Sequence, residues 1–127
     1  MSYSIGKYPE TVYPNEMSSE CPEAVAAIDV LFIQMRRYGP NPPGYSIKTL
    51  GKRHNGLWQL NLKVEKRQVR LLYAPYGNDI VFFRIHKKSS PQEQERAYAL
   101  AARRKAEFER IGESMAGLSS ETSRTIH

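Results

Sequence analysis

The sequence predicts an α+β fold in which one small antiparallel or mixed β-sheet carries an N-terminal helix and a C-terminal helix packed on it. Three observations predict this fold: a helical apolar pattern over residues 22–38, alternating segments between residues 57 and 86, and a strong helix-start signal at residue 90. The chain has 127 residues and a mass of 14.6 kDa, which suits a single domain. We therefore expect one sheet with helices packed against it.

The N-terminal part is expected to contain a short irregular segment and then a helix. In residues 1–17 a glycine and two prolines interrupt the apolar residues, which leaves room for one short strand at most. Residues 22–38 form the helix, because Pro22 suits the first helical position and apolar side chains recur at spacings of three and four. Gly39 and Pro40 are expected to end it.

The middle of the chain is expected to form three strands in an antiparallel meander. In the last strand, alternation places Val81, Phe83 and Ile85 on the core face and Arg84 and His86 on the opposite face. The connections are short, and a Pro-Tyr-Gly-Asn-Asp turn precedes this last strand. The expected strands cover residues 57–64, 68–74 and 80–86.

The C-terminal helix has the clearest start signal in the chain. Ser90 suits the cap position, Pro91 the first helical position, and Glu93 the third position after the cap, which together make a capping box. The helix is expected to run to Ile111 and to end at Gly112. The expected organisation is an N-terminal segment over residues 1–17, a folded domain over 18–111 and a disordered tail over 112–127.

The positive charge is concentrated in one third of the chain. The net charge is +6, yet residues 1–47 hold three lysines and arginines against five acidic residues. Residues 48–88 hold ten lysines and arginines against two acidic residues. Such a concentration is typical of a surface that binds a polyanion, because each cation placed near a phosphate releases condensed counterions.

Several function classes are excluded by composition. The longest apolar stretch, residues 24–33, is well short of the roughly 20 residues that span a bilayer, so we expect no membrane association. We also expect a cytoplasmic location, because no secretory signal is visible and one cysteine cannot form an internal disulfide. Cys21 and three histidines, His54, His86 and His127, lack metal-ligand spacing. We expect no metal, no cofactor and no small-molecule substrate.

One face of the expected sheet collects polar and cationic side chains. Such a face supports phosphodiester cleavage in RNA, which needs cations for the phosphate and groups that move protons from the 2′-hydroxyl and to the leaving 5′-oxygen. Arg70 suits phosphate binding because its guanidinium binds in a bidentate manner. His86 suits proton transfer, because an unperturbed imidazole titrates near neutrality. The residues of this face are Gln59, Asn61, Lys63, Arg70, Arg84 and His86.

Four segments in order resemble the RelE/ParE toxin superfamily, and in particular its HigB-like, phage-derived branch. They are residues 46–60 (SIKTLGKRHNGLWQL), 69–73 (VRLLY), 80–83 (IVFF) and 87–91 (KKSSP). Ala97 falls where that branch carries an alanine in its final helix. The resemblance covers residues 46–105 and implies a RelE-like fold. It also implies a type II toxin that cuts mRNA in the ribosomal A site and is neutralised by a cognate antitoxin.

The resemblance also implies roles for individual residues. Arg70 matches the phosphate-contacting arginine of the "Arg-x-x-Tyr" strand, and Lys87 and Lys88 match the basic pair after the last strand. With His86 they make the expected catalytic set of an endoribonuclease acting through the 2′-hydroxyl. Tyr98 matches the C-terminal tyrosine of RelE proteins. The expected RNA-binding residues are Lys52, Arg53, His54, Lys63, Arg67, Arg84 and Tyr98.

Two positions depart from the RelE pattern and leave alternatives open. Gln59 and Asn61 stand where RelE proteins carry catalytic lysines, so proton transfer would fall to His86 or His54. One alternative function is a ParE-like inhibitor of DNA gyrase, and another is a nucleic-acid-binding domain whose catalysis has decayed. Under all three, an acidic and partly disordered antitoxin segment would fit the basic face.

Overall fold

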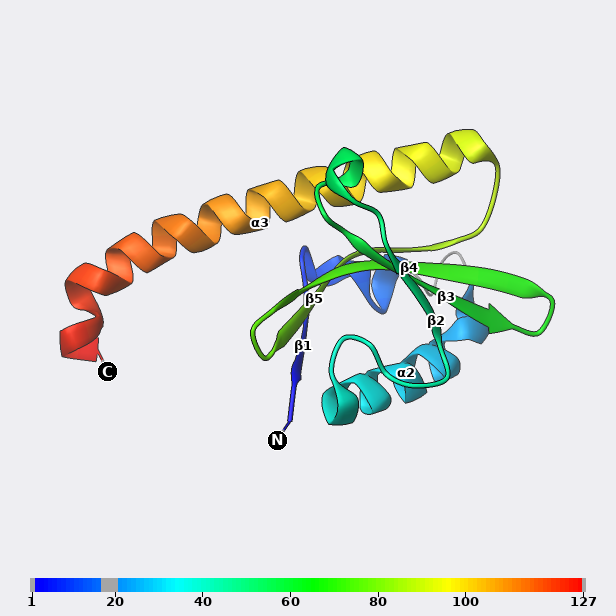
Figure 1. Cartoon of the computed structure of the whole chain (residues 1–127), viewed down its shortest axis with the longest axis horizontal. Helices are drawn as coiled ribbons and strands as arrows, with labels where there is room; N and C mark the ends of the chain where they lie inside the picture. The colour runs from blue at the N-terminus through cyan, green and yellow to red at the C-terminus, as the bar shows by residue number, and fades with distance from the viewer. Residues whose placement is uncertain (1, 17–20, 127) are drawn as a thin grey trace.

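The computed structural model describes the backbone of residues 2–16 and 21–126, and the side chains of these residues up to residue 112. It has an α+β architecture in which a five-stranded mixed sheet lies between two helices (Figure 1). No helix in the described part of the chain is long and apolar enough to cross a membrane. The main elements are β1 (Ser4–Lys7), α2 (Val25–Tyr38), β2 (Ser46–Thr49), β3 (Trp58–Val64), β4 (Arg67–Tyr76), β5 (Asp79–Lys87) and α3 (Pro91–Ile126).

The strand order across the sheet is β1-β5-β4-β3-β2. Strands β2 to β5 pair antiparallel in sequence order, which confirms the predicted meander, and β1 adds parallel to β5. The N-terminal segment therefore holds one strand, as expected. Strand β2, over Ser46–Thr49, was not predicted, and β4 continues to Tyr76, so the turn before β5 is shorter than predicted.

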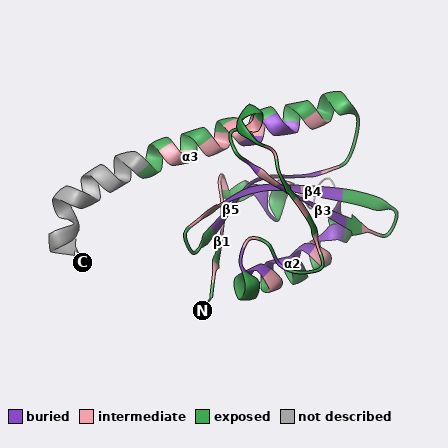
Figure 2. Cartoon of the chain, viewed as in Figure 1, coloured by how far each residue is buried: buried purple, intermediate pink, exposed green. Residues whose placement is uncertain are grey.

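Helix α2 covers one face of the sheet with apolar side chains. Pro22 opens a 3₁₀ turn that leads into α2, and the helix ends at Gly39, whose amide donates to the Met35 carbonyl. Gly39 has a φ of 94°, which favours glycine there. The main core of the protein forms between α2 and this face (Figure 2). Its largest members include Ile28, Leu31, Phe32, Met35, Leu60, Leu71, Tyr73 and Phe82.

Helix α3 covers part of the other face, and a β-bulge decides which residues it meets. Tyr73 pairs with Phe82, while the preceding Leu72 pairs with Arg84, so Phe83 is an extra residue in β5. The bulge reverses the alternation along β5. The prediction that Val81, Phe83 and Ile85 share one face is therefore wrong: Val81 and Phe83 pack under α3, and Ile85 packs on the α2 side.

The length of α3 differs from the prediction. The helix starts at Pro91 as expected, with the Glu93 amide donating to Ser90 Oγ at 3.2 Å. It then continues through Gly112 to Ile126, where a helix stop and a disordered tail were predicted, and it extends beyond the sheet (Figure 1). One glycine inside a helix costs only about 1 kcal/mol relative to alanine, which is too little to end a helix followed by good helix formers such as Met115 and Ala116.

Candidate functional site

Three polar side chains lie in one row across the middle strands of the sheet. In the register of β3, β4 and β5, Asn61 stands opposite Arg70, and Arg70 stands opposite His86. Residues directly opposite one another in a sheet project from the same face, and here that face is the one under α3. The structure therefore brings together Arg70 and His86, the expected phosphate-binding and proton-transfer residues.

The polar face is more enclosed than its composition predicts. Gln59 is fully buried and His86 is 3% exposed, because the first turns of α3 lie over them. The Tyr98 hydroxyl donates to Gln59 Oε1 at 2.5 Å, and Gln59 Nε2 donates to Asn61 Oδ1 at 3.0 Å. Gln94 also donates to the Tyr98 hydroxyl. Tyr98, an expected RNA-binding residue, is thus buried inside the protein. Gln59 and Asn61, the two positions that depart from the RelE pattern, belong to the same hydrogen-bond network as Tyr98.

A pocket of about 230 Å³ lies between the end of β5 and the first turns of α3. Three cations line it, together with one imidazole, one hydroxyl and one carboxylate, and two apolar side chains form part of its wall. A cavity with this lining suits a small anionic group rather than a large apolar ligand. The lining residues are Arg84, His86, Lys87, Ser89, Glu93, Arg96, Ala97 and Leu100.

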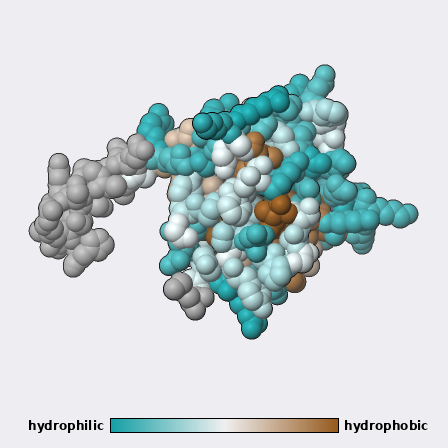
Figure 3. Space-filling view, in the orientation of Figure 1, coloured by the Kyte–Doolittle hydropathy of each residue, from teal (hydrophilic) through white to brown (hydrophobic). Residues whose placement is uncertain are grey.

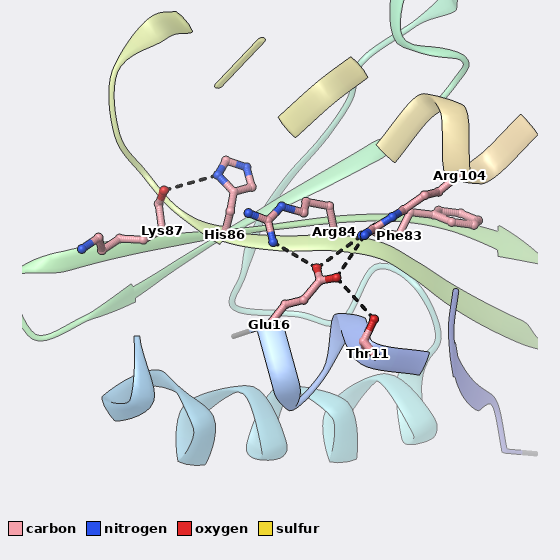
Figure 4. Close-up of polar contacts among 7 residues, drawn as sticks. All are labelled: Thr11, Glu16, Phe83, Arg84, His86, Lys87 and Arg104. Atoms are coloured by element: carbon pink, nitrogen blue, oxygen red, sulfur yellow. Dashed lines mark hydrogen bonds and ion pairs between the residues drawn. The ribbon is translucent and has the colours of Figure 1, made fainter. Parts of the chain in front are cut away.

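His86 lines this pocket and has one buried ring nitrogen without a partner. Its Nδ1 lies 3.3 Å from the Lys87 carbonyl oxygen, and since a carbonyl can only accept, this contact places the ring proton on Nδ1 (Figure 4). Nε2 is then a lone-pair acceptor, and it is buried without a hydrogen-bond partner among the described residues. Buried polar atoms are normally satisfied, so this atom indicates a missing partner.

The pKa of His86 differs from the value expected for an unperturbed imidazole. Burial, and then the positive charges of Arg84 and Arg70, lower the pKa of His86 from 6.5 to about 4. The side chain is therefore neutral at physiological pH, and the expectation that it titrates near neutrality is wrong. An imidazolium formed at this position would readily release its proton.

Glu16 holds the neighbouring cation in place. Its carboxylate accepts hydrogen bonds from Arg84 and Arg104, with the closest N–O distance of each pair at 3.0 Å (Figure 4). Arg104 also donates to the Phe83 carbonyl at 2.8 Å, so Glu16 links the N-terminal segment, β5 and α3. Burial raises the pKa of Glu16, but Arg104 and Arg84 outweigh it and leave the pKa below its ordinary value. Sequence reasoning gave Glu16 no role, because its partners are distant in the chain.

A second, basic groove adjoins the pocket. It is about 440 Å³ in volume and is lined by the β3–β4 turn and the end of β5. Lys87 lines both the pocket and the groove, so their positively charged linings meet at this residue. Arg67 forms an ion pair with Glu23 at 2.7 Å at this groove. The groove residues are Lys66, Arg67, Gln68, Lys87 and Lys88.

Other residues expected to bind RNA lie outside both cavities. Lys52, Arg53 and His54 form a 3₁₀ turn beside α3, where the His54 ring packs 4.5 Å from the Tyr98 ring. Lys63 is exposed on β3. The residues that sequence reasoning missed are Ser89 and Arg96, together with Glu93, which served only as a helix-start signal. The spacing of Glu93 and Arg96 with Ala97 and Leu100 on one helix face is the signal that could have placed these two, whereas Ser89 precedes the helix and has no such signal.

No family model, curated protein or solved structure matches this chain. Within residues 2–16 and 21–112, no group of three or more histidine, cysteine, aspartate or glutamate side chains could hold a metal ion. The surface turned to the viewer in Figure 3 is mostly hydrophilic, with a hydrophobic patch near its middle. The pocket and the groove are thus the places where charged side chains and an unmet buried atom come together.

Proposed function

We propose that this chain is a type II toxin of the RelE/ParE superfamily, of the HigB-like branch, and that it cuts mRNA on the ribosome. The observation that carries the proposal is His86, which lines a pocket with three cations, stands in register with Arg70 and has a buried Nε2 without a partner. The five-stranded mixed sheet with helices on both faces supports the RelE-like fold that the sequence resembles. The cytoplasmic setting of such a toxin is part of the proposal.

The proposed reaction uses side chains alone. The 2′-hydroxyl of the substrate ribose gives its proton to His86 Nε2, the 2′-oxygen attacks phosphorus, and the bond from phosphorus to the 5′-oxygen breaks. The imidazolium then returns its proton to the leaving 5′-oxygen, and the products are a 2′,3′-cyclic phosphate and a 5′-hydroxyl. Arg70 and Arg84 stabilise the charge that builds on the phosphate. The low pKa of His86 makes it a weak base and a strong acid, so it favours the second transfer.

The basic groove supplies a path for the rest of the RNA. Lys66, Arg67 and Lys88 continue the line of cations from Lys87, and cations spaced along a surface bind a nucleic-acid backbone without reading its sequence. The same surface would bind an acidic, partly disordered segment of a cognate antitoxin. We therefore assign the ribosome-bound mRNA and the antitoxin to overlapping basic surfaces.

Primer extension on an mRNA translated in a purified system tests the proposal. We expect discrete ribosome-dependent cuts with the wild type, and losses of roughly 10²- to 10⁴-fold in Arg70→Ala and His86→Gln. Arg36→Ala is the matched control, because Arg36 is an exposed arginine on α2, away from the pocket, and it should cut as the wild type does.

Two results would overturn the nuclease, and a third would overturn the roles of Arg70 and His86. Uncut mRNA with unimpaired translation and inhibited DNA supercoiling would identify a gyrase inhibitor. RNA binding without cuts would identify a domain whose catalysis has decayed. Cuts of equal strength from wild type and both variants would remove Arg70 and His86 from the reaction.

A further inference from the structure

The α3 side of the pocket has no assigned role in the reaction above. Glu93 and Arg96 lie in the first two turns of α3 and line the pocket opposite β5. Neither takes part in an ion pair with any described residue. Two charged side chains of opposite sign thus line a cavity whose other wall carries Arg84 and His86.

We propose that the first two turns of α3 complete a ribose-phosphate site, in which Arg96 binds the phosphate together with Arg84 and Glu93 accepts a hydrogen bond from the ribose 2′-hydroxyl. The inference rests on the proposed function and adds two substrate-binding residues to it. In this site Glu93 is the residue that makes ribose bind better than deoxyribose.

The polar groups of the pocket require a ligand with two kinds of group. Lys87 and Arg96 are donors only and form no ion pair among the described residues, so they attract an anion; Arg84 is also a donor, and it already pairs with Glu16. His86 Nε2 and the Glu93 carboxylate are acceptors only at neutral pH, and they require a donor. A phosphodiester has no donor of its own, so a phosphate alone leaves both acceptors unmet. A sugar 2′-hydroxyl beside the phosphate supplies one donor, which Glu93 accepts in the bound substrate and which turns to His86 Nε2 when the proton is transferred.

The helix N-terminus does not explain the anion site. The Glu93 amide already donates to Ser90 Oγ at 3.2 Å, and the Gln94 amide donates to the Ser90 carbonyl at 2.9 Å. These backbone donors are engaged, so phosphate binding in this pocket depends on side chains. Arg96, one turn further along the helix, is the side chain of α3 that supplies the charge.

The size of the pocket limits what enters it. Its volume of about 230 Å³ is below the range of roughly 300 to 1,000 Å³ typical of sites that enclose a drug-sized ligand. A phosphate and its sugar fit, with Ala97 and Leu100 against the sugar carbons, while the base stays outside. The pocket therefore binds the ribose and the phosphate and does not discriminate between bases.

Binding measurements test the inference separately from cleavage. The probes are a ribonucleoside 3′-monophosphate, its 2′-deoxy counterpart and an RNA trinucleotide, titrated by calorimetry into the full chain. We expect the wild type to prefer the ribonucleotide over the deoxynucleotide, and the trinucleotide over both. Equal binding of the two mononucleotides would overturn the assignment.

Substitutions on α3 give the sharper test. Arg96→Gln should weaken both mononucleotides about tenfold, because one charge-assisted contact to phosphate is lost. Glu93→Ala should abolish the preference for ribose and should strengthen binding of the deoxynucleotide, because a carboxylate that repels phosphate is removed. A merely structural glutamate would weaken both ligands. Glu95→Ala is the matched control, since Glu95 lies on the same helix outside the pocket, and it should keep the wild-type preference.

The two proposals fail in different ways. If the nucleotides bind as expected but translated mRNA is not cut, the nuclease is overturned and the ribose-phosphate site stands. If mRNA is cut, but Glu93→Ala and Arg96→Gln bind and cut as the wild type does, the role of α3 is overturned and the nuclease stands. Backbone amide spectra of each variant show whether it has folded.

Discussion

On one face of the sheet α2 packs against a continuous apolar surface, whereas on the other face α3 packs against apolar side chains over part of the strands only. The α2 face buries Leu60, Leu71, Tyr73 and Phe82 among its largest members. Under α3, apolar residues such as Leu72 give way to the polar row of Asn61, Arg70 and His86.

The α2 face of the sheet stabilises the fold, whereas the α3 face carries the polar site. The α2 face supplies most of the apolar burial, which is the main favourable term in folding. The α3 face keeps its helix in place with fewer apolar contacts and uses polar bonds, such as those of Tyr98 and Arg104, for the rest. This arrangement allows cations and an imidazole to stay close together beside a pocket without unfolding the domain.

The largest expected effect tests the apolar face. Phe82 is fully buried, with its ring 5.0 Å from the rings of both Phe32 and Tyr73. Phe82→Ala should lower the free energy of unfolding by about 3 to 5 kcal/mol in urea denaturation, because it leaves a cavity. Phe108→Ala, on the α3 side, should cost clearly less, since Phe108 is only half-buried. Equal losses would contradict the contrast between the faces.

The next effect concerns His86 and pH. The pKa of His86 is about 4 in the folded protein and 6.5 ordinarily, so between these values the unfolded chain binds a proton that the folded chain does not. The free energy of unfolding should therefore fall by about 3 kcal/mol as the pH drops from about 6.5 to about 4.

Urea denaturation from pH 4 to pH 8 measures this loss. His86→Gln should remove this part of the pH dependence, while His54→Gln should keep it. An NMR titration of the wild-type imidazole gives the same answer if the variant does not fold. A His86 signal that titrates near pH 6.5 is the result that the buried site does not allow.

A smaller effect tests the polar bonds under α3. Tyr98→Phe removes the hydroxyl that donates to Gln59 Oε1 at 2.5 Å and leaves a buried acceptor short of a partner. The expected loss is about 1 to 3 kcal/mol in the free energy of unfolding. The double variant Tyr98→Phe with Gln59→Leu should recover part of it, because the unmet acceptor is gone. If Gln59→Leu instead lowers the free energy of unfolding by a similar further amount, the hydrogen bond between Tyr98 and Gln59 is not what holds α3 on the sheet.

The smallest effect concerns the part of α3 beyond the sheet. Gly112 lies inside the helix, without a positive φ, and a Cβ there would meet open space. Gly112→Ala should raise helix content in circular dichroism and stabilise the helix by about 0.5 to 1 kcal/mol. Gly112→Pro should lower the helix content. If the helix stopped at Gly112, alanine there would gain no helix content and would be destabilising, because a helix-ending glycine has a positive φ.

Much of the fold could be predicted from local patterns. The apolar spacing through Ile28 and Phe32 predicted α2, and the alternation through Leu60 and Leu71 predicted the apolar face of β3 and β4. The capping residue Ser90 predicted the start of α3. These signals are readable because each depends on residues within one or two turns or along one strand.

Other features depended on distant partners. The bulge at Phe83 changed the faces of β5, since it follows from the pairing of β4 with β5 and has no signal in the alternation itself. Glu16 meets Arg84 and Arg104 only because the N-terminal segment crosses beside β5 and α3. Glu93 and Arg96 line the pocket only because α3 lies across the end of β5.

By itself, the sequence determined α2, strands β3 to β5, the start of α3, the apolar face of β3 and β4, and the concentration of basic charge in residues 48–88, since these depend on side chains close together in the chain. The tertiary structure alone decided that His86 is buried and neutral and that it lines a pocket shared with α3. Burial and pKa depend on what packs over a residue, and here the packing element begins only after β5 has ended.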